Sequence, residues 1–198
     1  RGNEMALNKE KIVVVMGGPS SEAEVSRRSG SAILKALQDK GYNAQGLELD
    51  PMNFANNLKE SGAEFVFNAI HGKFGEDGIL QGTCEMLGIP YTSSGVLAAA
   101  VTMDKVATKR FLQAQGIPTP KYAVLHRDGV IAGKAEHIKK EFGLPVVIKA
   151  ASQGSSIGVV IVEQESELED ALQEAFKYDA QVLVEEFIKG RELTVAVF

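Results

Sequence analysis

Residues 145 to 162 read PVVIKAASQGSSIGVVIV, and this stretch holds side chains suited to binding an anion. Two apolar runs rich in β-branched residues flank a turn of Gln, Gly and Ser, which is typical of a hairpin. The turn at Gly154, Ser155 and Ser156 has no bulky side chains, so its backbone N–H groups can approach a phosphate. Lys149 interrupts the first apolar run, where a buried ammonium is costly without a partner. An anionic ligand would be such a partner; a flexible surface hairpin with a chance lysine is the alternative.

Two further polar clusters follow apolar runs that are typical of buried strands. The first contains Glu22 and follows the run at 11–16, and the second begins at His71 and follows the run at 64–70. In open parallel sheets, ligands bind beyond the carboxyl ends of the strands, so both clusters are placed for binding. Glu22 either is stabilised by a helix macrodipole or faces a cleft and binds a cation such as a substrate ammonium. His71 either is structural, as a lone histidine usually is, or binds a ligand at the same edge, and its position after a strand favours binding.

Other charged residues have both a binding interpretation and a structural one. Lys105 begins an expected helix, where it is either solvated or part of an anion site at the helix N-terminus. Glu185, Glu186 and Glu192 lie at or near the ends of expected strands. Carboxylates at such ends accept hydrogen bonds from an adenine amino group or ribose hydroxyls, and solvent exposure is the alternative. The three histidines and single cysteine show no spacing of the zinc-site kind.

The elements that must position these side chains change character along the chain. In the first half, short apolar runs alternate with helical patterns, which predicts βαβ units and a parallel sheet. Strands are expected there at 11–16, 44–49 and 64–70, with helices up to about 40 and at 79–87 and a short helical or irregular crossover at 51–61. The second half predicts an α+β arrangement with an antiparallel sheet. Its expected strands are 122–125, 182–187 and 193–198 beside the hairpin, and its helices are 104–115, 135–142 and 166–178.

Local signals at the helix starts are specific enough to test. Ser21 with Glu24, and Ser166 with Glu169, have the spacing of capping boxes. The periodicity of the first helix predicts a buried stripe that begins at Val25.

Composition argues against nucleic-acid and membrane partners. The net charge is -5 and no basic stripe is present, whereas a nucleic-acid surface needs one. No apolar run approaches the roughly 18 residues that a membrane span requires, and no signal peptide is visible. The single cysteine, Cys84, excludes an internal disulfide and fits a reducing cytoplasm, so a cytoplasmic location is expected. Cys84 falls in an expected helix and is predicted to be a buried structural thiol.

Five stretches together resemble the D-alanine–D-alanine ligase family of ATP-grasp enzymes, in the family's order and spacing. They are VVVMGGPSSEAEVS, HGKFGEDGILQG, GIPYTSSGVLAAAVTMDK, VVIKAASQGSSIG and VLVEEFIKGRELTV. The resemblance implies an α/β fold in which a Rossmann-like N-terminal domain with a parallel sheet precedes an α+β ATP-grasp lid domain with an antiparallel sheet. The implied domains are residues 1–97 (N-terminal), 98–188 (central ATP-grasp subdomain) and 189–198 (the start of a C-terminal ATP-grasp subdomain).

The implied activity is ATP-dependent ligation of two D-alanine molecules to D-alanyl-D-alanine for peptidoglycan synthesis. ATP first phosphorylates the carboxylate of one D-alanine, and the amine of the second then attacks the acyl phosphate. Such chemistry needs positioning and charge neutralisation more than a protein nucleophile. Mg2+, or Mn2+ in its place, is the implied metal, and a homodimer formed through the N-terminal domain is the implied assembly.

The resemblance also implies roles for individual residues. Those implied for ATP binding are Lys105 and Lys149 at the phosphates, Gly154, Ser155 and Ser156 in the loop over them, Glu185 with the backbone of Glu186 and Phe187 at the adenine, and Glu192 at the ribose. Glu22 would hold the ammonium of the first D-alanine, aided by His71. Ser155 would join Glu22 through a tyrosine of a later loop, so Glu22 and Ser155 are the expected catalytic residues.

The resemblance leaves part of the family's machinery unassigned. The metal ligands, the oxyanion-stabilising arginine and the bridging tyrosine are expected beyond residue 198, and no metal ligand is assigned within the chain. The apolar run TVAVF at the end of the sequence predicts the N-terminal part of a larger protein, inactive as a ligase by itself. The alternatives are a ligase that makes D-alanyl-D-lactate, another ATP-grasp carboxylate–amine ligase, and a non-catalytic nucleotide-binding fragment.

Overall fold

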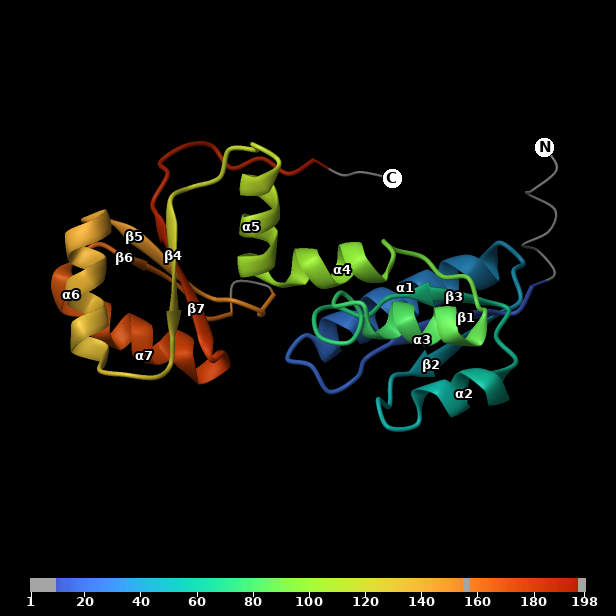
Figure 1. Cartoon of the computed structure of the whole chain (residues 1–198). Coiled ribbons are helices and arrows are strands. Elements are labelled where there is room, and N and C mark those ends of the chain that lie inside the picture. The colour runs from blue at the N-terminus through green and yellow to red at the C-terminus, as the bar shows by residue number, and fades with distance from the viewer. Residues whose placement is uncertain (1–9, 155–156, 196–198) are drawn as a thin grey trace. The chain divides into compact units, whose positions relative to one another are not determined.

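The computed structural model describes residues 10–154 and 157–195. The chain divides into two compact units, unit 1 up to Asp104 and unit 2 from Lys105 onward (Figure 1). Each unit has its own sheet and its own core. The predicted mixture of a parallel sheet followed by an antiparallel sheet is therefore confirmed, whereas the three-domain division remains a prediction.

Unit 1 is built on a three-stranded parallel sheet. Its strands are β1 (Ile12–Met16), β2 (Ala44–Glu48) and β3 (Phe65–Asn68), in the order β2-β1-β3. The central strand β1 is fully buried from Val13 to Val15. A parallel strand covered on both faces needs this continuous apolar run, which is why it was visible in the sequence.

Four helices complete unit 1: α1 (Ala23–Asp39), α2 (Phe54–Ser61), α3 (Ile79–Leu87) and α4 (Val96–Met103). Helices α2 and α3 bury Leu58, Leu80 and Cys84 against alternate residues of β1, beginning at Val13. Helix α1 covers the other face, where it approaches Met16. Burial raises the pKa of the Cys84 thiol to about 11, as expected of a structural cysteine.

Unit 2 is built on a four-stranded antiparallel sheet of order β4-β7-β5-β6. The strands are β4 (Tyr122–His126), β5 (Val146–Ala150), β6 (Val159–Val162) and β7 (Gln181–Glu186). The helices are α5 (Lys105–Ala114), α6 (Ile131–Phe142) and α7 (Leu168–Tyr178), with the 3-10 turn η1 (Glu165–Glu167) before α7. The predicted hairpin is confirmed as β5 and β6, which pair antiparallel.

The two faces of the unit 2 sheet have different coverings. Val146, Ile148 and Ala150 are buried on β5, and the first two join a core with residues of α6 and α7. Side chains alternate along a strand, so Lys149 lies on the opposite face. That face packs against α5, where Val106 contacts Leu183 of β7. Lys149 therefore interrupts the run in sequence without entering the main core.

Four local predictions are wrong. The predicted capping box of Ser21 and Glu24 is absent: the N-cap residue of α1 is Glu22, which makes no side-chain cap, and the Glu22 N–H donates to the Ser20 hydroxyl. The capping box near α7 is formed by Gln164 and Glu167, since η1 starts the helical segment earlier than predicted. Residues 193–195 form no strand in the described part of the chain.

The fourth error concerns the buried stripe of α1. Val25 is 44% exposed, whereas Ser26 and Gly30 are buried. The helix lies so close to the sheet at Gly30 that an added Cβ would be 2.5 Å from the Cβ of Met16. The backbones of α1 and β1 lie so close together that only small residues fit on this face of the helix. A prediction based on the spacing of apolar residues does not detect such positions.

Candidate functional site

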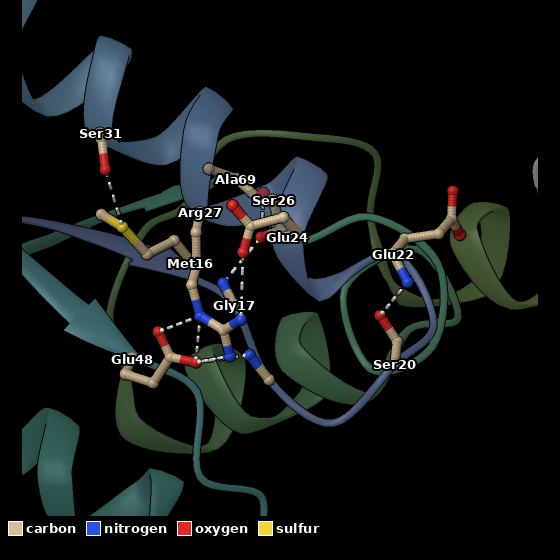
Figure 2. A network of polar contacts seen from close by, with 11 residues as sticks. Met16, Gly17, Ser20, Glu22, Glu24, Ser26, Arg27, Ser31, Glu48 and Ala69 are labelled. Atoms are coloured by element: carbon tan, nitrogen blue, oxygen red, sulfur yellow. Dashed lines mark hydrogen bonds and ion pairs between the residues drawn. The ribbon is translucent and has the colours of Figure 1, made fainter.

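A buried serine joins the carboxyl ends of two strands in unit 1. The Ser26 hydroxyl accepts the Gly17 N–H at 2.8 Å and donates to the Ala69 carbonyl at 2.7 Å (Figure 2). Gly17 follows β1 and Ala69 follows β3, so α1 fixes the edge where the sequence predicts ligand binding. Sequence reasoning missed Ser26. The only sequence signal for Ser26 is that it is a polar residue near the start of the helix, one position after Val25.

The glycine turn after β1 is held by a second set of contacts. Glu48 accepts the Gly18 N–H at 3.1 Å and pairs with Arg27 at 2.7 Å. The hydrogen bond from Arg27 is the main cause that holds the pKa of the Glu48 carboxyl below its usual value. Gly17 has φ +76°, and a Cβ there would collide with the Glu48 carboxylate. The turn is therefore specified by backbone geometry and shows no phosphate-binding GxGxxG pattern.

Glu22 lies beside the loop that begins at His71. The Ser20 hydroxyl donates to the His71 carbonyl at 3.2 Å, which fastens the turn before α1 to this loop. A Cβ added to Gly72 would collide with the Glu22 carboxylate, and Gly72 has φ +71°. Figure 2 shows the Glu22 side chain directed away from the Arg27–Glu48 pair. The structure thus brings together the two unit 1 residues that the sequence singled out.

His71 is surrounded by polar groups from α1 and from its own loop. Its Nε2 lies 3.3 Å from the Ser29 hydroxyl, and its Nδ1 lies 3.9 Å from a carboxylate oxygen of Glu76. The other oxygen of Glu76 accepts the Gly72 N–H at 2.9 Å. Glu76 therefore fixes the loop and faces the imidazole, which is oriented from both sides.

A pocket of about 490 Å³ opens beside this loop. His71, Glu76, Asn68 and Ser29 are among its lining residues, together with residues of α4. Gln81 also lines it. Gln81 is buried and donates to the Gly75 carbonyl at 2.7 Å, while its Oε1 has no hydrogen-bond partner among the described residues. A neutral glutamine inside an amphipathic helix gave no sequence signal for this position.

The predicted anion site of unit 2 contains a buried carboxylate with two lysines. Lys149 of β5 and Lys109 of α5 both pair with Glu185 of β7. Lys109 Nζ lies 2.6 Å from Glu185 Oε1, and the two side chains are only 8% and 7% exposed. Lys149 binds Glu185 Oε2 and is 28% exposed. Glu185 is therefore buried, and the exposed alternative is wrong for it.

The charge of Glu185 is set by two opposing effects. Burial acts to raise the pKa of its carboxyl, but hydrogen bonds and charge from Lys109 and Lys149 outweigh burial and hold the pKa below its usual value. Lys109 was not singled out from the sequence. Only the packing of α5 on the sheet shows that it points inward.

The hairpin turn is tied to the start of α5 and the end of α7. The Lys105 ammonium donates to the Gln153 carbonyl, and the Lys105 N–H donates to the Ala151 carbonyl at 3.0 Å. Asp179 accepts the Ser152 N–H at 2.9 Å. Gly154 is partly exposed. Ser155 and Ser156 lie outside the described residues. Lys105 thus lies beside the hairpin turn, and its binding of a phosphate stays a prediction.

The remaining predicted residues lie at or beyond the end of β7. Glu186 accepts the Lys121 N–H at 2.9 Å through its side chain, and its own N–H donates to the Lys121 carbonyl at 3.0 Å. Phe187 is 37% exposed. Glu192 lies in an exposed segment without regular secondary structure. The side chain of Glu186 therefore serves the β4–β7 edge.

Within residues 10–154 and 157–195, no group of three or more His, Cys, Asp or Glu side chains is arranged to hold a metal ion. None of the helices in that part of the chain is long and apolar enough to cross a membrane.

Comparison with known proteins identifies the class of protein to which the chain belongs, and then its family. The model for the D-ala D-ala ligase N-terminus matches residues 49–94, and that for the D-ala D-ala ligase C-terminus matches residues 111–198. A unit with a parallel three-stranded sheet followed by a unit with an antiparallel four-stranded sheet matches the fold of ATP-grasp ligases. Within that class, the chain belongs to the D-alanine–D-alanine ligase family.

Individual relatives agree with this assignment. A D-alanine--D-alanine ligase of Moorella thermoacetica is 51% identical over 190 residues, which cover 94% of this chain and 61% of that protein. The crystal structure of the Bacillus anthracis ligase complexed with ATP has a TM-score of 0.78 at 36% identity, covering 91% of this chain and 60% of that one. VanG D-Ala:D-Ser ligase of Enterococcus faecalis gives 0.73 at 29% identity, covering 91% and 63%. The chain spans about three-fifths of the length of these relatives.

Proposed function

We propose that this chain supplies the binding sites for the ATP phosphates and adenine and for the first D-alanine in an enzyme that makes D-alanyl-D-alanine. The first step transfers the γ-phosphoryl group of ATP to the carboxylate of one D-alanine and releases ADP. The amine of a second D-alanine then attacks the acyl carbon, and the tetrahedral intermediate expels phosphate. The observation that carries the proposal is the pairing of Lys149 with Glu185 beside a glycine-containing hairpin turn.

The residues of unit 2 fit a nucleotide. ATP supplies a transferable phosphoryl group, and its phosphates need cationic and N–H donors. Lys149 is partly exposed, so its ammonium is accessible to a phosphate, and Lys105 already lies against the turn that would cover it. Gly154, Ser155 and Ser156 are the residues proposed to donate their backbone N–H groups to the phosphates. Glu185 is held ionised and is therefore a strong acceptor for an adenine amino group.

The assignment of the other nucleotide contacts follows the chain beyond β7. The backbone of Glu186 and Phe187 continues from Glu185 and would line the adenine, and Glu192 would accept from the ribose. Mg2+, with Mn2+ as a substitute, would neutralise the charge of the phosphates during transfer. No residue of this chain is proposed as a metal ligand.

The residues of unit 1 fit a small zwitterion. Glu22 can accept the ammonium of D-alanine, and His71 is oriented beside it by Ser29 and Glu76. Because Gly72 has no side chain, the Glu22 carboxylate lies directly against the loop. Ser155 is the second catalytic residue of the proposal. D-serine is a second candidate for the second substrate, because the chain is similar to VanG D-Ala:D-Ser ligase of Enterococcus faecalis.

Assembly as a homodimer through unit 1 is part of the proposal. Helix α4 exposes Leu97, which is 78% exposed, next to two exposed alanines at 98 and 100. Sedimentation velocity of the wild-type chain and of Leu97→Glu tests this. A dimer that dissociates in the variant supports the proposal, and a monomeric wild-type chain contradicts it.

ATP binding by this chain tests the nucleotide part of the proposal. We expect calorimetry to show binding that Lys149→Ala weakens by about tenfold or more, since a charge-assisted hydrogen bond is worth about 1.5–3 kcal/mol. Lys140→Ala is the matched control, because Lys140 is an exposed lysine of α6 in the same unit. Equal ATP affinity in wild type and Lys149→Ala would contradict the placement of the phosphates.

A further inference from the structure

Glu185 is shared between two lysines that differ in accessibility. Its two carboxylate oxygens have different partners: Oε1 contacts Lys109 at 2.6 Å, and Oε2 contacts Lys149. The side chain of Lys109 is 8% exposed, whereas that of Lys149 is 28% exposed. The carboxylate therefore has an inner counter-ion and an outer one.

The inner lysine is held by more than its charge. Lys109 Nζ also donates to the Pro120 carbonyl at 3.0 Å and lies 5.1 Å from the centre of the Tyr122 ring. These contacts come from the linker before β4 and from β4 itself. The outer lysine, Lys149, lies near the carboxyl end of β5, close to the hairpin turn.

Binding of a phosphate by Lys149 would require it to give up at least part of its contact with Glu185. A buried carboxylate that loses its only cation is strongly disfavoured, because the low dielectric does not solvate the charge. Glu185 avoids that state because Lys109 stays in place. A carboxylate has about four lone-pair positions, so Glu185 can keep Lys109 while it accepts a further donor.

We propose that Lys109 is a positioning residue of the nucleotide site: it keeps Glu185 ionised and fixed, so that Lys149 can exchange Glu185 for a nucleotide phosphate. This inference rests on the proposed role of Lys149 in phosphate binding. Lys109 itself acts through Glu185 and is not assigned a contact with ATP. Without Lys109, Lys149 would become the sole counter-ion of Glu185 and would be retained by it.

The proposed exchange, in which Lys149 leaves Glu185 for a phosphate, affects only the binding of ligands that carry phosphates. Adenosine does not compete for Lys149, so its binding leaves the Lys149–Glu185 pair intact. In Lys109→Met, we expect the affinity for ATP to fall about tenfold or more and the affinity for adenosine to change by less than about twofold. Lys109→Arg keeps the charge and is expected to retain the ATP-to-adenosine affinity ratio of the wild type within about threefold.

Calorimetric titration of this chain with ATP and with adenosine is the test, and circular dichroism reports whether each variant is folded. Lys109→Gln removes the charge but keeps a donor for the Pro120 carbonyl. It replaces Lys109→Met in the affinity measurements if Lys109→Met does not fold. Lys140→Met is the control, with no expected change in either affinity. An ATP-to-adenosine ratio that stays within about twofold of wild type in a folded, uncharged Lys109 variant overturns this inference alone. A wild-type chain that does not bind ATP overturns the proposed nucleotide site and this inference together.

Discussion

The polar clusters of the two units are held in place by different physical means. In unit 1, glycines let side chains and backbones approach closely, and a neutral serine bridges the ends of β1 and β3. In unit 2, a carboxylate that is almost wholly buried is held by two ammonium groups. The unit 1 cluster is therefore sensitive to added volume, whereas the unit 2 cluster is sensitive to changes of charge.

Of these substitutions, removal of the Glu185 carboxylate should have the largest effect on the stability of the fold. Glu185→Ala leaves Lys109 buried without its counter-ion, and we expect a loss of about 3–5 kcal/mol in the free energy of unfolding of unit 2. Urea denaturation followed by circular dichroism measures the loss, with Glu169→Ala on the exposed side of α7 as the control. A loss below about 1 kcal/mol would mean that the pair behaves like a surface ion pair.

Acid should also destabilise unit 2 by protonating Glu185, and the loss of stability should be smaller than that caused by Glu185→Ala. The folded state holds the pKa of the Glu185 carboxyl below its ordinary value of 4.5, so the stabilisation is present above that pH. It is lost as the pH falls through the lower pKa of the folded state. Thermal unfolding from pH 7 downward should therefore show a fall in wild type that is reduced in Glu185→Gln. Parallel curves for the two proteins would contradict the assignment.

Loss of the bridging hydroxyl should be the largest single effect in unit 1 among the changes proposed here. Ser26→Ala leaves the Gly17 N–H and the Ala69 carbonyl buried without their partner, which costs about 2 kcal/mol. Urea denaturation measures it, and Ser31→Ala, an exposed serine on the same helix, is the control. A change within about 0.5 kcal/mol would show that water replaces the hydroxyl.

A pair of glycine substitutions tests whether volume is the limiting factor in unit 1. Gly30→Ala should destabilise by about 1 kcal/mol, because overpacking against Met16 exceeds the gain in helix propensity. Gly133→Ala in α6 meets no atom within 4 Å and should stabilise by about 0.5 kcal/mol. Opposite signs are the expected result in thermal unfolding. Equal signs would remove close packing as the explanation for Gly30.

The sequence predicted elements better than it predicted partners. The run at 12–16 and the helix at 79–87 were correctly placed, because apolar periodicity is a local property. The partner of Lys149 was not visible, since Val147 and Glu185 become opposite one another only when β5 pairs with β7. Lys109 was missed for the same kind of reason: its burial depends on how α5 packs on the sheet.

Small residues in unit 1 set a second limit on what the sequence could predict. The buried positions of α1 are a serine and a glycine, selected by close approach to the sheet, so the apolar stripe was placed one residue too early. The positions of Glu22 and His71 at strand ends were nonetheless predictable. Their places after the first and third predicted strands follow from the order of the motifs along the chain. The loop geometry around Gly72 brings Glu22 and His71 together in the structure.

D-alanine-dependent release of phosphate from ATP tests the central claim most directly. Residues 10–195 of this chain would replace the matched part of the Moorella thermoacetica relative, and the chimaera would be measured beside its parent. We predict turnover that depends on both ATP and D-alanine and that Glu22→Gln lowers by at least about tenfold, since a charged hydrogen bond to substrate is lost. A folded chimaera that binds ATP but releases no phosphate with D-alanine, or one that turns over equally fast with Glu22→Gln, would contradict the account.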